Sequence, residues 1–242
     1  MLSLTKLNFE PVELNHADML KAAFSSQKYR TSNFTAGSAI MWQKIYNIRV
    51  CEAFGCVILS ADYPYEGKCY SIPVGGDVKA AINAVYDECK NSGEPCIFFD
   101  VPEGGLELLK EIFGEKRLKI STDDGWSDYL YNASDLITYS GKKFNGQRNH
   151  VNRFNRLYPD AVFEPITKEN FDEAYEFLKN YISQNGTTSE SGELEGCAAI
   201  RLMKRYFDLN LYGAILKANN KIISLSIGEK VGDTLFVHVE KG

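Results

Sequence analysis

The order of the expected strands and helices constrains this chain more than any other feature of its sequence. Short runs rich in β-branched and aromatic residues alternate with amphipathic stretches of helical spacing. From the N-terminus the expected elements are a strand at 7–9, helices at 16–27 and 36–48, strands at 49–54, 56–61 and 69–74, a helix at 77–93, a strand at 95–101, a helix at 105–114, and strands at 117–122 and 127–132. This order predicts an α/β (α+β) fold built around an antiparallel meander.

A second series of elements follows and begins in the same order as the first. The expected elements are a helical stretch at 133–158, a strand at 161–166, a helix at 168–184, a loop at 185–193, a helix at 194–208, and strands at 211–218, 221–230 and 234–240. Asn219 and Asn220 are expected to turn the hairpin between two of these strands. We therefore expect an N-terminal half at 1–134, a basic linker helix at 135–160 and a C-terminal half at 161–242.

The element order resembles that of the GNAT (acyl-CoA N-acyltransferase) fold, most clearly over residues 6–132. In GNAT proteins the turn after the fourth strand, and the helix that it opens, hold the pyrophosphate of acyl-CoA on backbone N–H groups. The second half ends at Gly242 before such a helix, so the resemblance implies an incomplete half in a shortened product. In the first half Gly75 and Gly76 occupy the corresponding turn. The acyl-CoA signature is absent and Asp77 would repel phosphate, so we expect a structural turn there.

Charge and composition exclude several classes of protein. With 44% hydrophobic residues and a net charge of −5, the chain is globular and has no general affinity for nucleic acid. Its six cysteines form no CxxC pair, which indicates reduced thiols and a cytoplasmic protein. No segment approaches the ~20 apolar residues that cross a bilayer, so any contact with lipid is expected to be peripheral. The three histidines lack the spacing of metal ligands, and we expect no metal.

A basic stretch at 141–159 is the most informative part of the sequence. It contains five Lys or Arg residues and no carboxylate. Cations near a helix C-terminus are favoured by about 0.3–1 kcal/mol, which explains Arg153 and Arg156 as a solvated face. The same effect opposes Lys142 and Lys143 at a helix start, so these residues indicate an anionic ligand such as a phosphate or carboxylate. The predicted anion-binding residues are Lys142, Lys143, Arg148, Asn149 and Asn152.

This stretch and its surroundings resemble the phosphatidylglycerol lysyltransferase C-terminal domain family. The residues that carry the resemblance are GKKFNGQRNHVNRF after SDYLYN, the tryptophan of MWQKIY, the segment IPVGGDVKAAI, Asp128 and Tyr129 with Tyr131, and the pair Glu240 and Lys241. The resemblance implies a tandem GNAT fold akin to the Fem-type peptidyltransferases. Its lysyltransferase members move an aminoacyl group from tRNA to a lipid headgroup, whereas many short soluble members have no established activity. This chain looks like a short member, and it departs from the family by ending soon after the Glu-Lys pair.

Two classes of function remain open at this point. The first is an acyl or aminoacyl transferase, with acyl-CoA or aminoacyl-tRNA as donor and an amine or hydroxyl as acceptor. Tyr129 and Lys241 would then join the basic residues at the substrate, and Glu240 would act as general base if burial raised its pKa. The alternative is a non-catalytic GNAT-fold module that binds an anionic small molecule or a protein partner. Direct binding of tRNA by the basic stretch is a third possibility.

Overall fold

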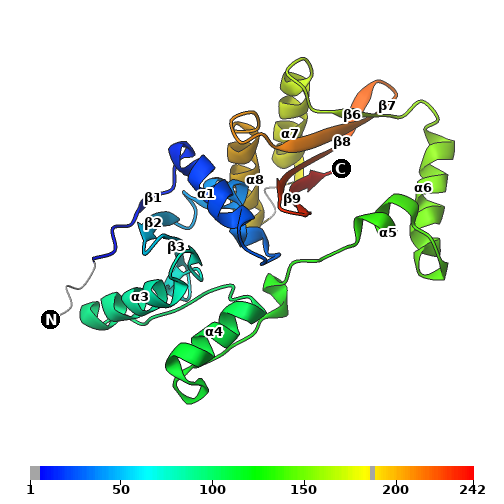
Figure 1. Cartoon of the computed structure of the whole chain (residues 1–242). Helices are drawn as coiled ribbons and strands as arrows, with labels where there is room; N and C mark the ends of the chain where they lie inside the picture. The colour runs from blue at the N-terminus through cyan, green and yellow to red at the C-terminus, as the bar shows by residue number, and fades with distance from the viewer. Residues whose placement is uncertain (1–5, 186–188) are drawn as a thin grey trace.

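The computed structural model describes residues 6–185 and 189–242, which form two antiparallel sheets with helices packed around them (Figure 1). The α+β fold class expected from the sequence is therefore confirmed. Within the described residues, no helix is long and apolar enough to cross a bilayer.

The first sheet forms the centre of the N-terminal half. Its strands are β1 (Glu10–Pro11), β2 (Arg49–Ala53), β3 (Cys56–Tyr63) and β4 (Gly67–Tyr70) in that order, with β5 (Val74–Gly75) also paired to β3. The side chains of β3 alternate between two faces. Val57 and Leu59 pack in one cluster with α1 (Ala17–Ser25), whereas Cys56 and Ile58 pack in another with α3 (Val78–Ser92). The sheet is thus covered on both faces.

The turn that opens α3 is structural, as expected. A Cβ atom on Gly76 would lie 2.4 Å from the carbonyl oxygen of Phe54, so the close approach of two backbones requires glycine. The Asp77 side chain accepts a hydrogen bond of 3.0 Å from the backbone N–H of Ala80 and caps the helix. A carboxylate therefore occupies the helix N-terminus where a pyrophosphate would bind.

Four of the strands expected in the first half are absent or displaced. The first strand lies at Glu10–Pro11, slightly beyond 7–9, and 95–101 contributes only a parallel bridge from Phe98 to Tyr70. The closing strands at 117–122 and 127–132 are wrong, because both segments lack strand structure and are almost wholly exposed. Helix α4 (Glu103–Phe113) precedes them, and 3-10 turns form at Glu115–Arg117 and Asp124–Trp126. Alternating apolar residues form a strand only beside a free sheet edge, and these segments run along none.

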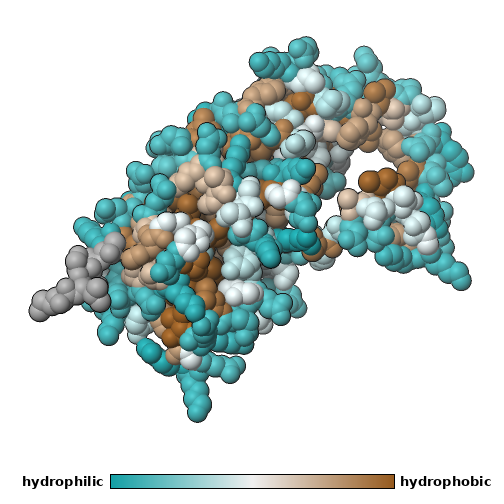
Figure 2. Space-filling view, viewed as in Figure 1, coloured by the Kyte–Doolittle hydropathy of each residue, from teal (hydrophilic) through white to brown (hydrophobic). Residues whose placement is uncertain are grey.

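The linker segment, defined here as residues 133–158, contains two helices rather than one. Helix α5 (Ala133–Thr138) ends at Tyr139, and a 3-10 turn at Lys142–Phe144 leads into α6 (Asn145–Leu157). The break follows from left-handed backbone at Tyr139 (φ 45°) and positive φ at Gly141 (φ 87°). Neither helix buries a residue, and the segment stands away from the main body in Figure 2.

The second sheet forms the centre of the C-terminal half. It runs in the order β6 (Val162–Pro165), β7 (Tyr212–Ala218), β8 (Lys221–Val231) and β9 (Thr234–Lys241). Asn219 and Asn220 have φ of 51° and 58° and turn the hairpin between β7 and β8, which confirms that prediction. Helix α7 (Phe171–Asn185) packs against β8 of this sheet, and α8 (Glu190–Met203) packs against α7. Of the expected loop at 185–193, residues 186–188 lie outside the described residues and α8 already begins at Glu190.

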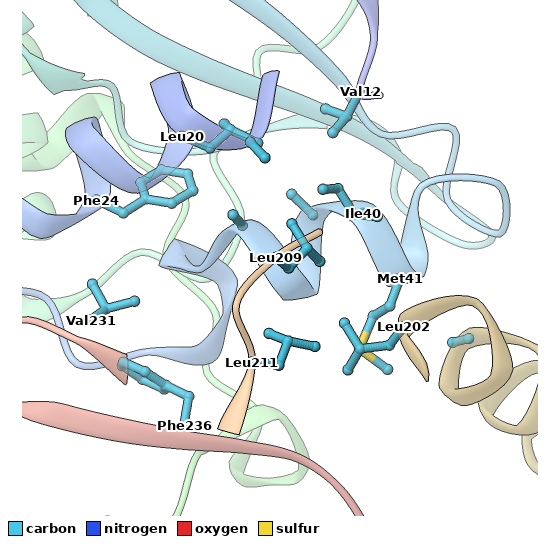
Figure 3. Close-up of a cluster of buried hydrophobic side chains, with 14 of the residues drawn as sticks. Val12, Leu20, Phe24, Ile40, Met41, Leu202, Leu209, Leu211, Val231 and Phe236 are labelled. Carbon is cyan, nitrogen blue, oxygen red and sulfur yellow. The ribbon is translucent and has the colours of Figure 1, made fainter. Parts of the chain in front are cut away.

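The two halves share one hydrophobic core (Figure 3). Helix α2 (Ala36–Trp42) lies between α1 of its own half and α8 of the other half. Residues Ala36 to Met41 are all buried. The close-up shows Met41 of α2 beside Leu202 of α8, with Leu209 and Leu211 facing the first half. The halves are therefore one packed unit through α2 and α8.

Charged side chains of the C-terminal half hold both ends of α2. At its start the backbone N–H of Gly37 donates to Glu229 Oε2 at 2.6 Å. At its end the Arg201 guanidinium donates to the carbonyl oxygen of Met41 at 2.8 Å. A negative group at the N-terminus and a positive group at the C-terminus both match the helix dipole. This arrangement fixes the direction in which the two halves dock.

Candidate functional site

A cavity of about 350 Å³ opens within the N-terminal half, beside α2. Its walls come from the 3-10 turn at Ser32–Phe34, from α2, β3 and β4, and from the segments 99–100 and 125–128. A volume of this size is at the lower end of the range for small-molecule sites. The cavity is therefore large enough for an amino acid or a small headgroup.

Aromatic rings form one continuous wall of this cavity. Trp42 contacts Tyr46 with ring centroids 5.6 Å apart, Tyr46 contacts Tyr63 at 5.0 Å, and Tyr63 contacts Phe99 at 4.3 Å. Trp126 meets the edge of Phe99 at 5.1 Å and closes the series. Rings at these separations are in mutual contact. The wall therefore joins α2, the sheet and the segment that follows α4.

Two carboxylates line the cavity, and both are held by the 3-10 turn at Ser32–Phe34. The Asn33 amide donates to Asp100 Oδ2. The backbone N–H of Ser32 donates to Asp128 Oδ2 at 2.7 Å, and the Ser32 hydroxyl donates to Asp128 Oδ1 at 3.2 Å. Asp100 itself has left-handed backbone with φ of 49°, which aspartate tolerates better than most residues. These contacts fix the positions of both carboxylates.

The electrostatics of the cavity centre on Asp100. Burial, with a smaller contribution from the nearby Asp128 carboxylate, raises the pKa of Asp100 from 3.8 to about 6. Burial also raises the pKa of Tyr63, and the Asp100 charge adds to this effect. Among the described residues that line the cavity, none is Lys, Arg or His. At neutral pH the cavity therefore holds negative charge without a compensating cation from its own walls.

The raised pKa predicts that Asp100→Asn stabilises the protein at pH 7.5 and leaves its stability unchanged near pH 4. An acid whose pKa is raised on folding binds more protons in the folded state, so its contribution to stability falls as pH rises from about 4 to about 6. The full shift corresponds to about 3 kcal/mol. Because the carboxyl is partly solvent-exposed, we expect about 1 kcal/mol. Urea unfolding at both pH values measures this difference, and an equal effect at the two values would contradict it.

The residues predicted to bind an anion lie elsewhere, in the linker segment. Lys142, Lys143, Asn149 and Asn152 are exposed, and none of them lines the cavity. Lys143 pairs with Asp135 at 2.9 Å and lies over the ring of Phe144. The structure thus brings these side chains together on one exposed segment. They form part of an open surface and not of an enclosed pocket.

Arg148 is occupied by contacts within the linker segment. Its guanidinium donates to the carbonyl oxygens of Tyr139 and Gly141 and to the Asn145 side chain. These contacts close the bend between α5 and α6. Arg148 therefore stabilises the bend, which is a role that the sequence did not indicate.

The other predicted site residues are separated from the basic stretch. Glu240 is exposed on β9, so it is not the buried carboxylate that was expected to act as general base. Lys241 is half-buried and pairs with Glu195. Tyr129 is 87% exposed and stacks on Tyr131 with ring centroids 6.4 Å apart. A second hollow, between the halves, is lined by 27–30 and 231–234 with Phe236, and includes none of these residues.

The sequence alone did not indicate the cavity residues as a site. Trp42 and Asp128 contribute only to the family resemblance, and Asp100 lies in the strand expected at 95–101. A usable signal was present, because acidic residues stand beside aromatic ones in FFD at 98–100 and in WSD at 126–128. What the sequence could not show is that Phe99 and Asp100 line the same cavity as 126–128, with the rings of Phe99 and Trp126 in contact.

Comparison with known proteins identifies the family to which the chain belongs. Residues 25–242 match the family described as phosphatidylglycerol lysyltransferase, C-terminal. The chain belongs to this family. The match covers most of the chain and confirms the resemblance seen in the sequence. Membership in the phosphatidylglycerol lysyltransferase C-terminal family supports an activity of the aminoacyltransferase kind.

Two solved structures are similar to this chain in fold. A conserved protein of unknown function from Bacteroides thetaiotaomicron VPI-5482 is similar with a TM-score of 0.90 and 28% identity, over 98% of this chain and 80% of that one. The C-terminal domain of a candidate lysylphosphatidylglycerol synthetase from Agrobacterium fabrum is similar with a TM-score of 0.53 and 11% identity, over 94% of this chain and 67% of that one. The likeness is consistent with the expected GNAT-like fold. Among curated proteins, none matches the chain.

Proposed function

We propose that this protein transfers an aminoacyl group from an aminoacyl-tRNA to a hydroxyl or amine acceptor. The observation that carries this proposal is the family match over residues 25–242. In such a step the acceptor oxygen or nitrogen attacks the ester carbonyl carbon of the aminoacyl group. The new bond forms as the carbon–oxygen bond to the terminal ribose breaks, and the acceptor's proton ends on the ribose oxygen.

The helix termini of the first half favour aminoacyl-tRNA over acyl-CoA as donor. Acyl-CoA in a GNAT protein needs free N–H groups at the start of a helix for its pyrophosphate. In this chain the Asp77 carboxylate caps the corresponding helix, α3. A pyrophosphate at this position would be repelled by the Asp77 carboxylate, and the N–H group of Ala80 is already hydrogen-bonded to that side chain.

The linker segment supplies the cations that a tRNA backbone would require. Among the described residues, Lys142, Arg153 and Arg156 make no ion pair with a carboxylate. They project from an exposed helix region that carries none of the buried core. Phosphate contacts from three such residues give a strongly salt-dependent affinity. Because the net charge of the chain is −5, we expect tRNA to contact only this local basic patch and not a large part of the surface.

The cavity beside α2 would hold the small-molecule end of the reaction. Positioning of two reactants supplies much of the rate enhancement in transfers of this kind. With a pKa of about 6, Asp100 would be ionised at neutral pH and able to accept a proton from a bound group. A cavity for one substrate and a basic segment for the other together provide the two contacts that transfer needs.

The experiment is a transfer assay with lysyl-tRNA labelled in the lysyl group and phosphatidylglycerol vesicles, the substrates that the family name indicates. We expect label in the lipid extract with the wild-type protein. The variant Lys142→Ala/Arg153→Ala/Arg156→Ala should lose tRNA affinity about tenfold or more at 150 mM salt, with a shallower salt dependence.

The matched control removes three exposed lysines from other surfaces, as Lys90→Ala/Lys116→Ala/Lys204→Ala. It changes net charge equally and should retain tRNA affinity. If both variants lose affinity to the same extent, the basic stretch is not the tRNA contact. If no aminoacyl acceptor is labelled by the wild-type protein, transfer is excluded for these substrates.

The second candidate function is a non-catalytic module that binds an anionic small molecule or a protein partner. Exposure of Glu240 favours it, because the expected general base lacks the burial that would tune it. Binding of tRNA without transfer to any hydroxyl or amine acceptor would support this alternative.

A further inference from the structure

We propose that the cavity beside α2 binds an organic ammonium ion, held between the aromatic wall and the carboxylate of Asp100. The charge of the lining is the first argument. Asp100 and Asp128 are the charged side chains of the cavity wall, and no basic residue lines it within the described part of the chain. A ligand that carried a carboxylate or phosphate would be repelled, whereas a cation would restore neutrality.

The aromatic wall is the second argument. Trp42, Tyr46, Tyr63, Phe99 and Trp126 all line the cavity. Aromatic faces attract cations through the ring quadrupole, most strongly for tryptophan and tyrosine, and the attraction increases when the cation is desolvated. Protein cations do lie over other rings of this chain, such as Lys68 over Phe9 and Lys179 over Tyr175. The cavity places aromatic rings and carboxylates together in the same way, and its described lining residues include no Lys or Arg.

The hydrogen bonding of Asp100 is the third argument. Its Oδ2 accepts from Asn33, whereas Oδ1 has no hydrogen-bond partner among the described residues. Many exposed carboxylates of the chain are instead neutralised by lysine, as Glu111 is by Lys79 and Glu173 by Lys217. A partly buried carboxylate that lines a cavity and has one oxygen without a hydrogen-bond partner among the described residues has the arrangement expected for a ligand contact.

This inference deepens the proposed function and rests on it only for the identity of the substrate that carries the ammonium group. An amine-bearing acceptor and the amino group of an aminoacyl donor share this chemistry. Binding of the ammonium ion itself requires neither tRNA nor turnover, so it can be tested separately from transfer.

The test uses three probes of nearly equal size: n-butylammonium, n-butanol and butyrate. The chain contains two tryptophans, Trp42 and Trp126, and both line the cavity, so intrinsic fluorescence reports its occupancy directly. Titrations at pH 7.5 and constant ionic strength give the three affinities. We expect n-butylammonium to bind at least tenfold more tightly than n-butanol, and butyrate to bind more weakly than either.

The deciding variant is Asp100→Asn, which keeps the shape of the side chain and can still accept from Asn33. It should bring the affinity for n-butylammonium to within about threefold of that for n-butanol, while its melting temperature does not fall. The control Asp18→Asn removes an exposed carboxylate on α1 and should retain the wild-type preference.

Equal affinities of the wild-type protein for n-butylammonium and n-butanol would overturn the proposal. An unchanged preference in Asp100→Asn would also overturn it. A wild-type preference lost in Asp100→Asn would stand even if no aminoacyl transfer were found, so failure of the proposed function is distinguishable from failure of this inference.

Discussion

Replacement of Gly37 by alanine is expected to destabilise the protein by about 2–3 kcal/mol, in the upper part of the range of about 1–3 kcal/mol that is usual for overpacking a buried site. An added Cβ atom would lie 2.6 Å from Glu229 Oε2 and 2.9 Å from His238 Nε2. Both of these side chains are almost fully buried, so neither can move aside into solvent. The substitution would also weaken the hydrogen bond from the Gly37 N–H to Glu229. Thermal unfolding should show a melting temperature lowered by several degrees.

The control for this prediction is Gly146→Ala, the same substitution in another helix. A Cβ atom on Gly146 would meet nothing within 4 Å. Alanine there should stabilise α6 by about 0.4–1 kcal/mol through reduced backbone entropy of the unfolded chain. Opposite signs for the two variants are expected. A neutral or stabilising effect of Gly37→Ala would show that α2 is free to move from Glu229.

Replacement of Leu202 by alanine is expected to lower the stability of both halves by about 2–5 kcal/mol. Leu202 belongs to α8 in the C-terminal half, is fully buried, and lies beside Met41 of α2 in Figure 3. Both tryptophans of the chain, in contrast, belong to the N-terminal half. Because the halves share one core, the substitution should shift the urea midpoint measured by tryptophan fluorescence.

The control for Leu202→Ala is Leu157→Ala, which truncates a leucine that is 61% exposed at the end of α6. It should change stability by no more than about 0.5 kcal/mol. Circular dichroism should report the same midpoint as fluorescence for each variant. An unshifted fluorescence transition in Leu202→Ala, with an earlier transition by circular dichroism, would mean that the halves unfold independently.

The sequence predicted most helices and the sheet strands because their patterns are local. The apolar stripe of α1, the Asp77 cap of α3 and the Asn219–Asn220 turn each follow from a few neighbouring residues. The strands expected at 117–122 and 127–132 fail for a non-local reason. Their alternating residues would suit a strand, but pairing requires a free edge, and edge positions depend on the whole topology.

The candidate site was harder to predict than the fold. The basic stretch can be recognised because its Lys and Arg residues lie close together in the sequence. The structure shows that Arg148 holds a local bend, and the role of the other basic residues is a proposal. The cavity is built from segments that begin at Ser32 and end at Asp128, so proximity in space has no counterpart in the sequence. The division at 1–134, 135–160 and 161–242 also remains a prediction.

The exposure of the linker segment affects how the sequence of this protein can evolve. Because α5 and α6 bury nothing and the halves are joined through α2 and α8, substitutions in 133–158 affect the folding free energy little. Residues that recognise a partner can then be exchanged in that region without loss of the folded state, while the cavity is constrained by the core around it. Relatives can therefore differ widely in the partner that binds this segment and still keep the same cavity beside α2.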